Sequence, residues 1–346
     1  MHNIALIRGK IGSSKIIAMV KANAYGHGIR SVGAALDGHV DLLGVCSIDE
    51  AMVLRSSGVR SPILLTQGAF EESELLLAAK EGFHLVFHNE EQLGWLDRQK
   101  LPAPLNSWIK INTGLSRLGF HREEAESVYL RLFKSIHTRK PVRIMSHFAC
   151  ADERAHPLNE AQIAAFQVFI KDKNSEYSLC NSAGVINFPQ CAYDFVRPGI
   201  SIYGVSPISG KVGSDFGLKP VMSVHSKIIS IQKVKKNETI GYGARYRFTQ
   251  DARVGIVAFG YGDGYPLTTT DGTPVLVNNR ECHLVGRVSM DMLAVDLSNC
   301  PNAKIGDDVL LWGESLPIER VCASSSTHVW NTLSGVQNRV KFLWKG

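Results

Sequence analysis

The feature that most constrains the fold is a regular alternation of short apolar runs with amphipathic segments over the first two-thirds of the chain. The apolar runs are rich in Val, Ile and Leu, and they span residues 16–20, 42–46, 62–65, 84–87, 108–111, 143–145, 177–180 and 195–196. Helix-like segments lie between them, for example at 48–55, 71–79, 122–133 and 158–170. Eight strands that alternate with helices are typical of a (β/α)8 barrel. An open doubly wound sheet is the less favoured alternative.

The pattern changes after residue 218, where the apolar runs become β-type and follow one another closely. These runs lie at 221–231, 254–259, 273–277, 284–288, 293–297 and 308–311. Asp-Gly pairs at 263–264 and 271–272 and the Asn-Asn pair at 278–279 supply turns between them. A chain of 346 residues is long enough for two domains. We therefore predict an α/β fold, with an N-terminal (β/α)8 TIM-like barrel at 1–218 and a mostly-β domain at 219–346.

Composition excludes several classes of protein. Apolar residues make up 45% of the chain and charged residues 20%, which is typical of a globular protein. The net charge is +6, but the basic residues form no run, so we expect no nucleic-acid partner. No apolar stretch approaches ~18 residues, so we expect no membrane span, and we expect no signal peptide. The 7 cysteines are odd in number and lack a CxxC spacing, which predicts reduced thiols in a cytoplasmic protein and no metal site.

Polar and charged side chains follow the ends of five predicted barrel strands. In order along the chain they are Lys21, Arg117, His147, Ser182 and Arg197. Because the carboxyl ends of barrel strands meet at one rim, where barrel enzymes carry their active sites, we expect these side chains to converge. Each alone is more often a solvated charge, an ion pair, a core histidine or a helix cap. Their convergence is what makes a functional site the better interpretation.

The loops after the last two strands are where barrels often bind a phosphate. Ser182 offers a hydroxyl there, and Gly199 lets backbone N–H groups approach an anion closely. A lysine on the same rim, Lys21, can form a Schiff base with pyridoxal phosphate. These residues point to pyridoxal phosphate as the cofactor. A barrel enzyme that acts on a phosphosugar is the alternative, although it has no need of that lysine.

Eight ordered motifs strongly resemble the alanine racemases, over nearly the whole chain. They are VKANAYGHG at 20–28, INTGLSRLG at 111–119, SHFACADE at 146–153, NSAG at 181–184, VRPGISIYG at 196–204, GYGARY at 241–246, GYGDGYP at 260–266 and GRVSMD at 286–291. This resemblance implies an N-terminal barrel, a C-terminal β domain and pyridoxal phosphate.

The resemblance also implies the catalytic pair and the cofactor site. Lys21 matches the Schiff-base lysine, which is also the base on one face of the substrate. Tyr242 matches the tyrosine base on the other face, which the partner subunit supplies in the family, so we expect a homodimer with shared active sites. Arg197 matches the arginine that hydrogen-bonds the pyridine nitrogen, and His147 the histidine beside the ring. The phosphate-binding residues of the family match Tyr25, Ser182, Gly199 and Ile200.

Further matches concern the substrate. Arg117 matches an arginine near the substrate carboxylate, and Lys110 matches a lysine that many members carry as a carbamate. The backbone N–H of Met290 is expected to meet the same carboxylate. Tyr261 is expected at the route by which substrate enters.

Some positions depart from the family pattern. Trp330 stands where a tyrosine usually donates to the phosphate, and its indole N–H can still donate. Leu267 replaces a frequent arginine, and Asn112 and Leu115 replace Asp and Met.

The expected function is interconversion of L-alanine and D-alanine, which supplies D-alanine for peptidoglycan. A racemase of broader range that accepts serine, a related decarboxylase and a non-catalytic carrier of the cofactor are the alternatives.

Overall fold

The computed structural model describes residues 1–345 and divides them into two compact units. The first comprises residues 1–202 and 207–210, and the second comprises residues 203–206 and 211–345. The domain boundary between residues 218 and 219 stays a prediction about which segments fold independently. No helix within the described residues is both long enough and apolar enough to span a membrane. The seven cysteines are free thiols, and five of them are buried.

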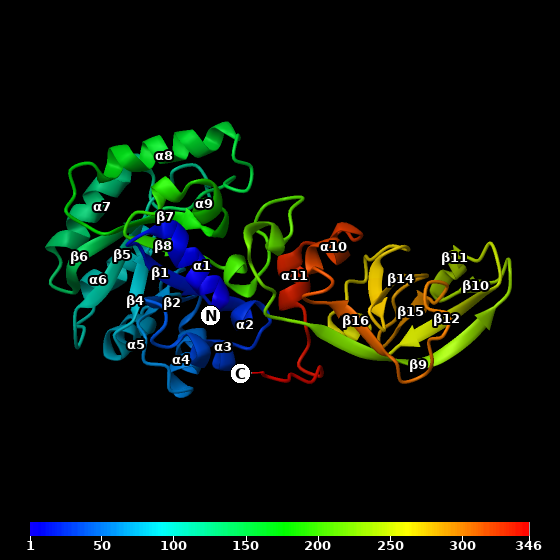
Figure 1. Ribbon diagram of the computed structural model, residues 1–346. Coiled ribbons are helices and arrows are strands. Elements are labelled where there is room, and N and C mark those ends of the chain that lie inside the picture. The colour runs from blue at the N-terminus through cyan, green and yellow to red at the C-terminus, as the bar shows by residue number, and fades with distance from the viewer. Residues whose placement is uncertain (346) are drawn as a thin grey trace. The chain divides into compact units, whose positions relative to one another are not determined.

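The first unit is a closed barrel of eight parallel strands in sequential order (Figure 1). The closure comes from pairing of the first and last strands, which are in register at Lys15 with Phe195 and Ile16 with Val196. This confirms the predicted barrel, and the open sheet is wrong. The strands are β1 (Lys15–Met19), β2 (Leu42–Val45), β3 (Ile63–Leu65), β4 (His84–Phe87), β5 (Leu105–Lys110), β6 (Thr138–Met145), β7 (Tyr177–Asn181) and β8 (Phe195–Arg197).

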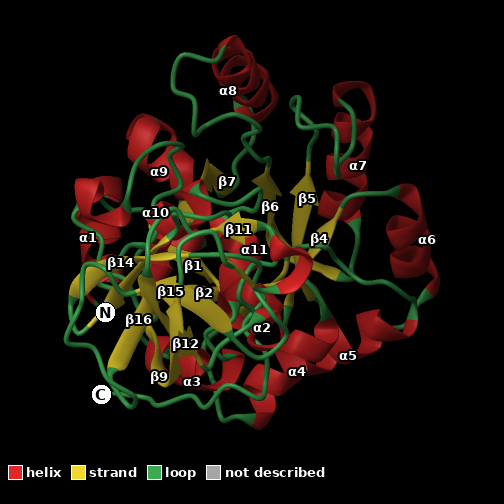
Figure 2. Cartoon of the chain, turned by 90° about the vertical axis from the view of Figure 1, so that its right-hand side faces the viewer, coloured by secondary structure: helices red, strands yellow, loops and turns green. Residues whose placement is uncertain are grey.

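Helices surround the barrel strands on the outside (Figure 2). Their apolar positions face inward, as in α7, where Ala125, Val128 and Leu132 are buried at helical spacing. Strand residues are therefore covered on both faces, which explains why β2 and β3 are apolar throughout and why every residue of β4 is buried. The helices of this unit are α1 (His2–Ile11), α2 (Lys21–Tyr25), α3 (Ile29–Leu36), α4 (Ile48–Ser56), α5 (Ser73–Glu81), α6 (Glu90–Arg98), α7 (Arg122–Lys134), α8 (Pro157–Ile170) and α9 (Ser182–Asn187).

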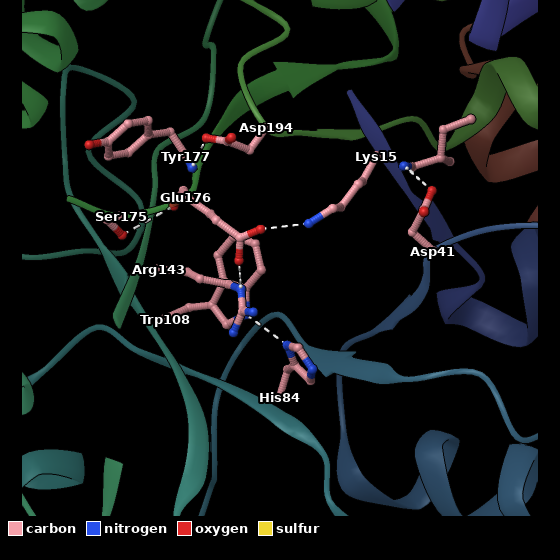
Figure 3. A network of polar contacts seen from close by, with 10 residues as sticks. Lys15, Asp41, His84, Trp108, Arg143, Ser175, Glu176, Tyr177 and Asp194 are labelled. Atoms are coloured by element: carbon pink, nitrogen blue, oxygen red, sulfur yellow. Dashed lines mark hydrogen bonds and ion pairs between the residues drawn. The ribbon is translucent and has the colours of Figure 1, made fainter. Parts of the chain in front are cut away.

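A network of charged and aromatic side chains joins the amino-terminal ends of the barrel strands (Figure 3). Glu176 accepts from Lys15 at 2.6 Å and from Arg143 at 2.7 Å, so one carboxylate links β1, β6 and the start of β7. Arg143 lies 5.7 Å from the ring centroid of Trp108. The indole N–H of Trp108 donates to Nδ1 of buried His84 at 3.2 Å. In barrels, this end serves stability rather than catalysis.

The second unit is built around a closed antiparallel barrel of six strands, in the order β12-β15-β14-β13-β16-β9. Asn278 and Asn279 both have positive φ, at 49° and 61°, and form the predicted two-residue turn between β13 and β14. The predicted strand at 284–288 is wrong, because β14 ends at Leu284 and Gly286 has a φ of 76°. The strands are β9 (Val224–Val234), β10 (Thr239–Ile240), β11 (Tyr246–Arg247), β12 (Ala252–Val257), β13 (Pro274–Val277), β14 (Arg280–Leu284), β15 (Leu293–Asp296) and β16 (Asp308–Trp312), with helices α10 (Ile318–Ala323) and α11 (Val329–Ser334).

Candidate active site

Lys21 stands at the carboxyl end of β1 and opens an unusual left-handed turn, α2. The next four residues, Ala22 to Tyr25, have φ values of 52°, 53°, 54° and 51°. Left-handed backbone costs roughly 1–2 kcal/mol for each non-glycine residue, so the surrounding structure must hold the turn in place. Strain of this kind is concentrated at functional sites in proteins.

Glu50 of α4 stabilises the turn through its carboxylate. One oxygen accepts from the backbone N–H of Ala22 at 2.7 Å, and the other accepts from Cys46 N–H at 2.9 Å. At the far end of the turn, the Asn23 side chain accepts from Ile29 N–H at 2.8 Å. These contacts fix the backbone at both ends of the left-handed turn. They therefore also fix the backbone position from which the Lys21 side chain extends.

Tyr25, Ser182 and Gly199 form a small polar cradle where β7 and β8 end. A Cβ atom added to Gly199 would lie 2.3 Å from the hydroxyl of Tyr25, so only glycine leaves room for that hydroxyl. The Ser182 hydroxyl oxygen accepts from Gly199 N–H at 2.8 Å and from the Ser201 hydroxyl at 3.1 Å. Ile200 is buried beside them. Burial, followed by the nearby Cys46, raises the pKa of Tyr25 to about 12, so its hydroxyl stays a donor.

Arg197 and His147 form a buried pair at the same rim. The Arg197 guanidinium donates to the Ser178 hydroxyl and to the backbone carbonyl of Ser146, and its Nη2 lies 3.1 Å from His147 Nδ1. Burial lowers the pKa of Arg197 to about 10. Burial and then the charge of Arg197 hold the pKa of His147 well below its usual value, so the imidazole is neutral. Gln162 of α8 donates to the His147 carbonyl at 2.9 Å and fixes its backbone.

Four cations converge on this rim. Lys110, at the end of β5, is only 7% exposed, and its pKa falls to about 7 because of burial and then the charges of Arg197, Arg117 and Lys21. Arg117 lies in the following loop, whose turn is shaped by the Asn112 side chain. No ion pair formed within residues 1–345 includes any of these four cations. The arrangement therefore favours an anionic ligand.

The candidate residues of the second unit lie on four separate segments of the chain. Tyr242 stands at the tip of the β10–β11 hairpin and is 71% exposed. Flanking Gly241 and Gly243 have φ values of 74° and 75°, which a residue with a side chain rarely adopts. Trp330 lies on α11 and is 40% exposed.

Tyr261 and Met290 are brought together by backbone pairing. Tyr261 N–H donates to the Ser289 carbonyl at 3.0 Å, and Gly262 N–H donates to the Met290 carbonyl at 2.8 Å. Both side chains remain partly exposed. The structure thus assembles two sets of the predicted residues, one on each unit.

The residues of the barrel rim fit pyridoxal phosphate. The cation cluster suits its phosphate and ring oxygens, and the Gly199 cradle gathers hydroxyl and N–H groups of the kind that hold a phosphate. Lys21 supplies the primary amine. Within the described residues, no group of three or more His, Cys, Asp or Glu side chains could hold a metal ion.

Sequence reasoning missed Glu50 and Gln162. Glu50 carries a local signal, because Ser47 and Glu50 match the pattern of a helix capping box. That pattern predicts a contact with the adjacent backbone, not with Ala22, which lies 28 residues earlier. Gln162 carries no signal beyond being a polar residue on the buried side of α8.

Comparisons with known proteins agree over nearly the whole chain. A family model described as alanine racemase, N-terminal domain, matches residues 1–207, and one described as alanine racemase, C-terminal domain, matches residues 221–344. A Shigella sonnei protein named alanine racemase, biosynthetic, is 43% identical over 340 residues, which are 98% of this chain and 94% of that protein.

Solved structures are similar as well. Biosynthetic alanine racemase from Pseudomonas aeruginosa has a TM-score of 0.95 at 42% identity, with 98% of this chain and 94% of that chain covered. Alanine racemase from Bartonella henselae with covalently bound pyridoxal phosphate has a TM-score of 0.85 at 25% identity, with 98% and 95% covered. The chain therefore belongs to the alanine racemase family, a family of isomerases that use pyridoxal phosphate.

Proposed function

We propose that the protein interconverts L-alanine and D-alanine with pyridoxal phosphate as cofactor, and that Lys21 and Tyr242 are its two bases. The observation that carries the proposal is the cluster of four cations at the barrel rim, Lys21, Lys110, Arg117 and Arg197, none of which forms an ion pair within residues 1–345. Such a set attracts both a phosphate ester and an amino-acid carboxylate. The relatives described above, named alanine racemases, support the choice of substrate.

Residues of the barrel, together with Trp330 of the second unit, would hold the cofactor. Ser182, Tyr25 and the backbone N–H groups at Gly199 and Ile200 would hold the phosphate, and Trp330 would add an indole N–H. Arg197, always a donor, would face an unprotonated ring nitrogen. When bound, pyridoxal phosphate supplies an aldehyde that condenses with amines and a ring that withdraws electrons from the substrate Cα. Arg117 and the backbone N–H of Met290 would orient the substrate carboxylate.

Two bases suit racemisation, because a proton leaves one face of the Cα and returns to the other, and one base cannot easily serve both faces. Lys21 would serve one face through its amine, and Tyr242 the opposite face through its phenol. His147, neutral and hydrogen-bonded to Arg197 through Nδ1, carries its proton on Nε2. The pKa of Lys110 is about 7, so a neutral amine is accessible. Its carbamylation would replace the repulsion between Lys110 and Arg117 with attraction and so keep Arg117 in place.

We further propose that the active enzyme is a homodimer in which Tyr242 enters the site of the partner subunit. Large apolar or aromatic side chains of the second unit are exposed at Tyr242, Met290, Met292 and Leu267. A second copy of the chain would cover them, and a two-fold dimer would use the same surface twice.

Mixing two inactive variants tests the shared site. Lys21→Ala and Tyr242→Phe each remove one base, and a mixed dimer would contain one site with both bases intact. Equal mixing followed by subunit exchange should therefore restore about a quarter of wild-type activity. No restoration, in mixtures shown to contain mixed dimers, would place both bases in one chain.

Substrate range is tested by assaying a panel of L-amino acids for their D-enantiomers. We expect alanine to be the best substrate. Serine is the main alternative substrate, because Trp330 differs in bulk from the tyrosine usual at this position. Alanine as the poorest substrate would overturn the proposal.

The cellular role we propose is supply of D-alanine for peptidoglycan from the cytoplasm. The seven free thiols support this compartment, because cysteines stay reduced there.

A further inference from the structure

Arg339 bridges two loops of the second unit through two carboxylates. Its Nε donates to one oxygen of Asp263 at 2.6 Å, and its Nη2 donates to Asp291 at 2.6 Å. The second oxygen of Asp263 accepts from Gly260 N–H at 2.8 Å, so both oxygens of this carboxylate accept hydrogen bonds. The Asp263 side chain is 11% exposed, which makes it the more buried of the two carboxylates.

The bridged loops are the ones that carry Tyr261 and Met290. Asp263 ends the short turn that begins at Tyr261, and Asp291 directly follows Met290. The loops already touch through their backbones, because a Cβ atom on Gly260 would lie 2.3 Å from the Ser289 carbonyl oxygen. With backbone contact this close, a small displacement of either loop would move the Met290 N–H relative to Tyr261.

The segment that carries Arg339 is anchored to the same turn at a second point. Gln337 N–H donates to the Asp263 carbonyl at 3.0 Å. A Cβ atom on Gly264 would lie 2.5 Å from the Gly335 carbonyl oxygen, so the chain at 335–337 packs directly against the turn. A Cβ atom on Gly262 would lie 3.5 Å from the guanidinium carbon of Arg339. The backbone near Arg339 is thus anchored to the turn, and the guanidinium is held between the two loops.

We propose that Arg339 is a positioning residue for the substrate carboxylate. By holding Asp263 and Asp291 in one forked contact, it fixes the spacing of Tyr261 and the Met290 N–H, and so sets the affinity for the carboxylate. This inference rests on the proposed function, which gives Met290 its contact with substrate. A lysine cannot reproduce the fork, because an ammonium lacks the planar set of donors that reaches two carboxylates at once.

The chain offers a matched control in Arg320. It lies in the same unit, is 46% exposed against 48% for Arg339, and donates to both oxygens of Glu281 at 3.1 Å. Arg320→Met therefore removes an arginine–carboxylate contact of similar exposure that joins neither loop. Arg339→Met, Arg339→Lys, Asp291→Asn and Arg320→Met would be compared with the wild-type holoenzyme. The measured quantities are kcat and KM for L-alanine and the inhibition constant of propionate, a carboxylate without the amine.

We expect Arg339→Met to raise both KM and the propionate inhibition constant about fivefold, because the two carboxylates lose the arginine that spaces their loops. The kcat of Arg339→Met should change less than its KM. The KM and propionate inhibition constants of Arg339→Lys and Asp291→Asn should lie between those of Arg339→Met and wild type. Both constants of Arg320→Met should equal those of wild type. Equal KM and propionate constants in the Arg339 and Arg320 variants would overturn the proposal, as would a fall confined to kcat. If Arg339→Met does not fold, Arg339→Lys and Asp291→Asn decide by the same criteria. A wild-type protein that does not racemise alanine would instead refute the proposed function.

Discussion

Arg197 Nη2 lies 3.1 Å from His147 Nδ1 at the barrel rim. Because a guanidinium can only donate hydrogen bonds, the imidazole nitrogen must accept, and the proton of a neutral ring then sits on Nε2. The direction of the pKa shift of His147 agrees, since burial and the charge of Arg197 both disfavour the imidazolium. The pair thus defines one tautomer, with the proton on Nε2, which lies 3.5 Å from the side-chain amide nitrogen of Asn181.

Replacing Arg197 with Gln tests this relationship. Gln keeps an N–H donor but removes the charge, so the pKa of His147 should rise from its depressed value. NMR of histidine-labelled protein would follow the ring during a pH titration. An unchanged His147 titration in the variant would show that burial alone keeps the imidazole neutral.

Gly199→Ala should weaken pyridoxal phosphate binding. The added Cβ atom would lie 2.3 Å from the Tyr25 hydroxyl, and overpacking of this kind costs about 1–3 kcal/mol, or up to about a hundredfold in Kd. Fluorescence titration of the apoenzyme with the cofactor measures the change. Gly9→Ala is the control, because a Cβ atom there meets nothing within 4 Å. Equal affinities in the two variants would contradict the cradle.

Glu50→Ala should slow the labelling of Lys21. Its carboxylate holds the N–H groups of Ala22 and Cys46, and hydrogen bonds to a charged group contribute about 1.5–3 kcal/mol each. Without it, the left-handed turn loses the contact that offsets its strain. The rate of borohydride-trapped attachment of pyridoxal phosphate to Lys21, measured by mass spectrometry, should fall at least about tenfold.

Glu74→Ala provides the comparison for that experiment. Glu74 accepts from the N–H of Phe70 at 2.7 Å, a contact of the same kind in the same unit. Its loss should leave labelling unchanged. A parallel decrease in both variants would mean that the effect is a general loss of barrel stability.

His84 should make the barrel sensitive to acid. Burial, followed by the charge of Arg143, lowers its pKa to about 3, below the ~6.5 of an unfolded histidine. Between these values the unfolded chain binds the extra proton, so stability falls as the pH drops from about 6.5 toward 3. His84→Gln keeps an acceptor for the Trp108 indole without titrating. At pH 4.5 the variant should retain on the order of 2–3 kcal/mol of unfolding free energy that wild type loses. Hydrogen exchange of the β4 and β5 amides measures this difference. Identical acid sensitivity in both proteins would count against a neutral His84.

The barrel could be predicted from the sequence because its strands are buried on both faces and therefore read as apolar runs. The errors occur where that condition fails. Strand β6 begins at Thr138, five residues before the predicted run, because Arg139 and Lys140 are exposed at its start. Strand β14 alternates buried and exposed residues, with only Cys282 and Leu284 buried. Its polar residues interrupt the apolar pattern, so the sequence did not predict this strand.

The candidate site was predictable only in part, for a different reason. Lys21, His147 and Arg197 follow strands, and strand ends converge in any parallel barrel. Glu50 and Arg339 act through partners far away in the chain, 28 residues for Glu50 with Ala22 and 76 for Arg339 with Asp263. No local pattern specifies such contacts, which depend on how the loops pack.

The most direct test of the account is exchange of the alanine α-hydrogen in deuterated water by the Tyr242→Phe holoenzyme. Loss of the phenol removes one base, so exchange should persist for one enantiomer of alanine and fall at least about a hundredfold for the other. Interconversion of the enantiomers should fall with it. Wild-type exchange of both enantiomers by this variant would contradict a mechanism in which Lys21 and Tyr242 serve opposite faces of the substrate.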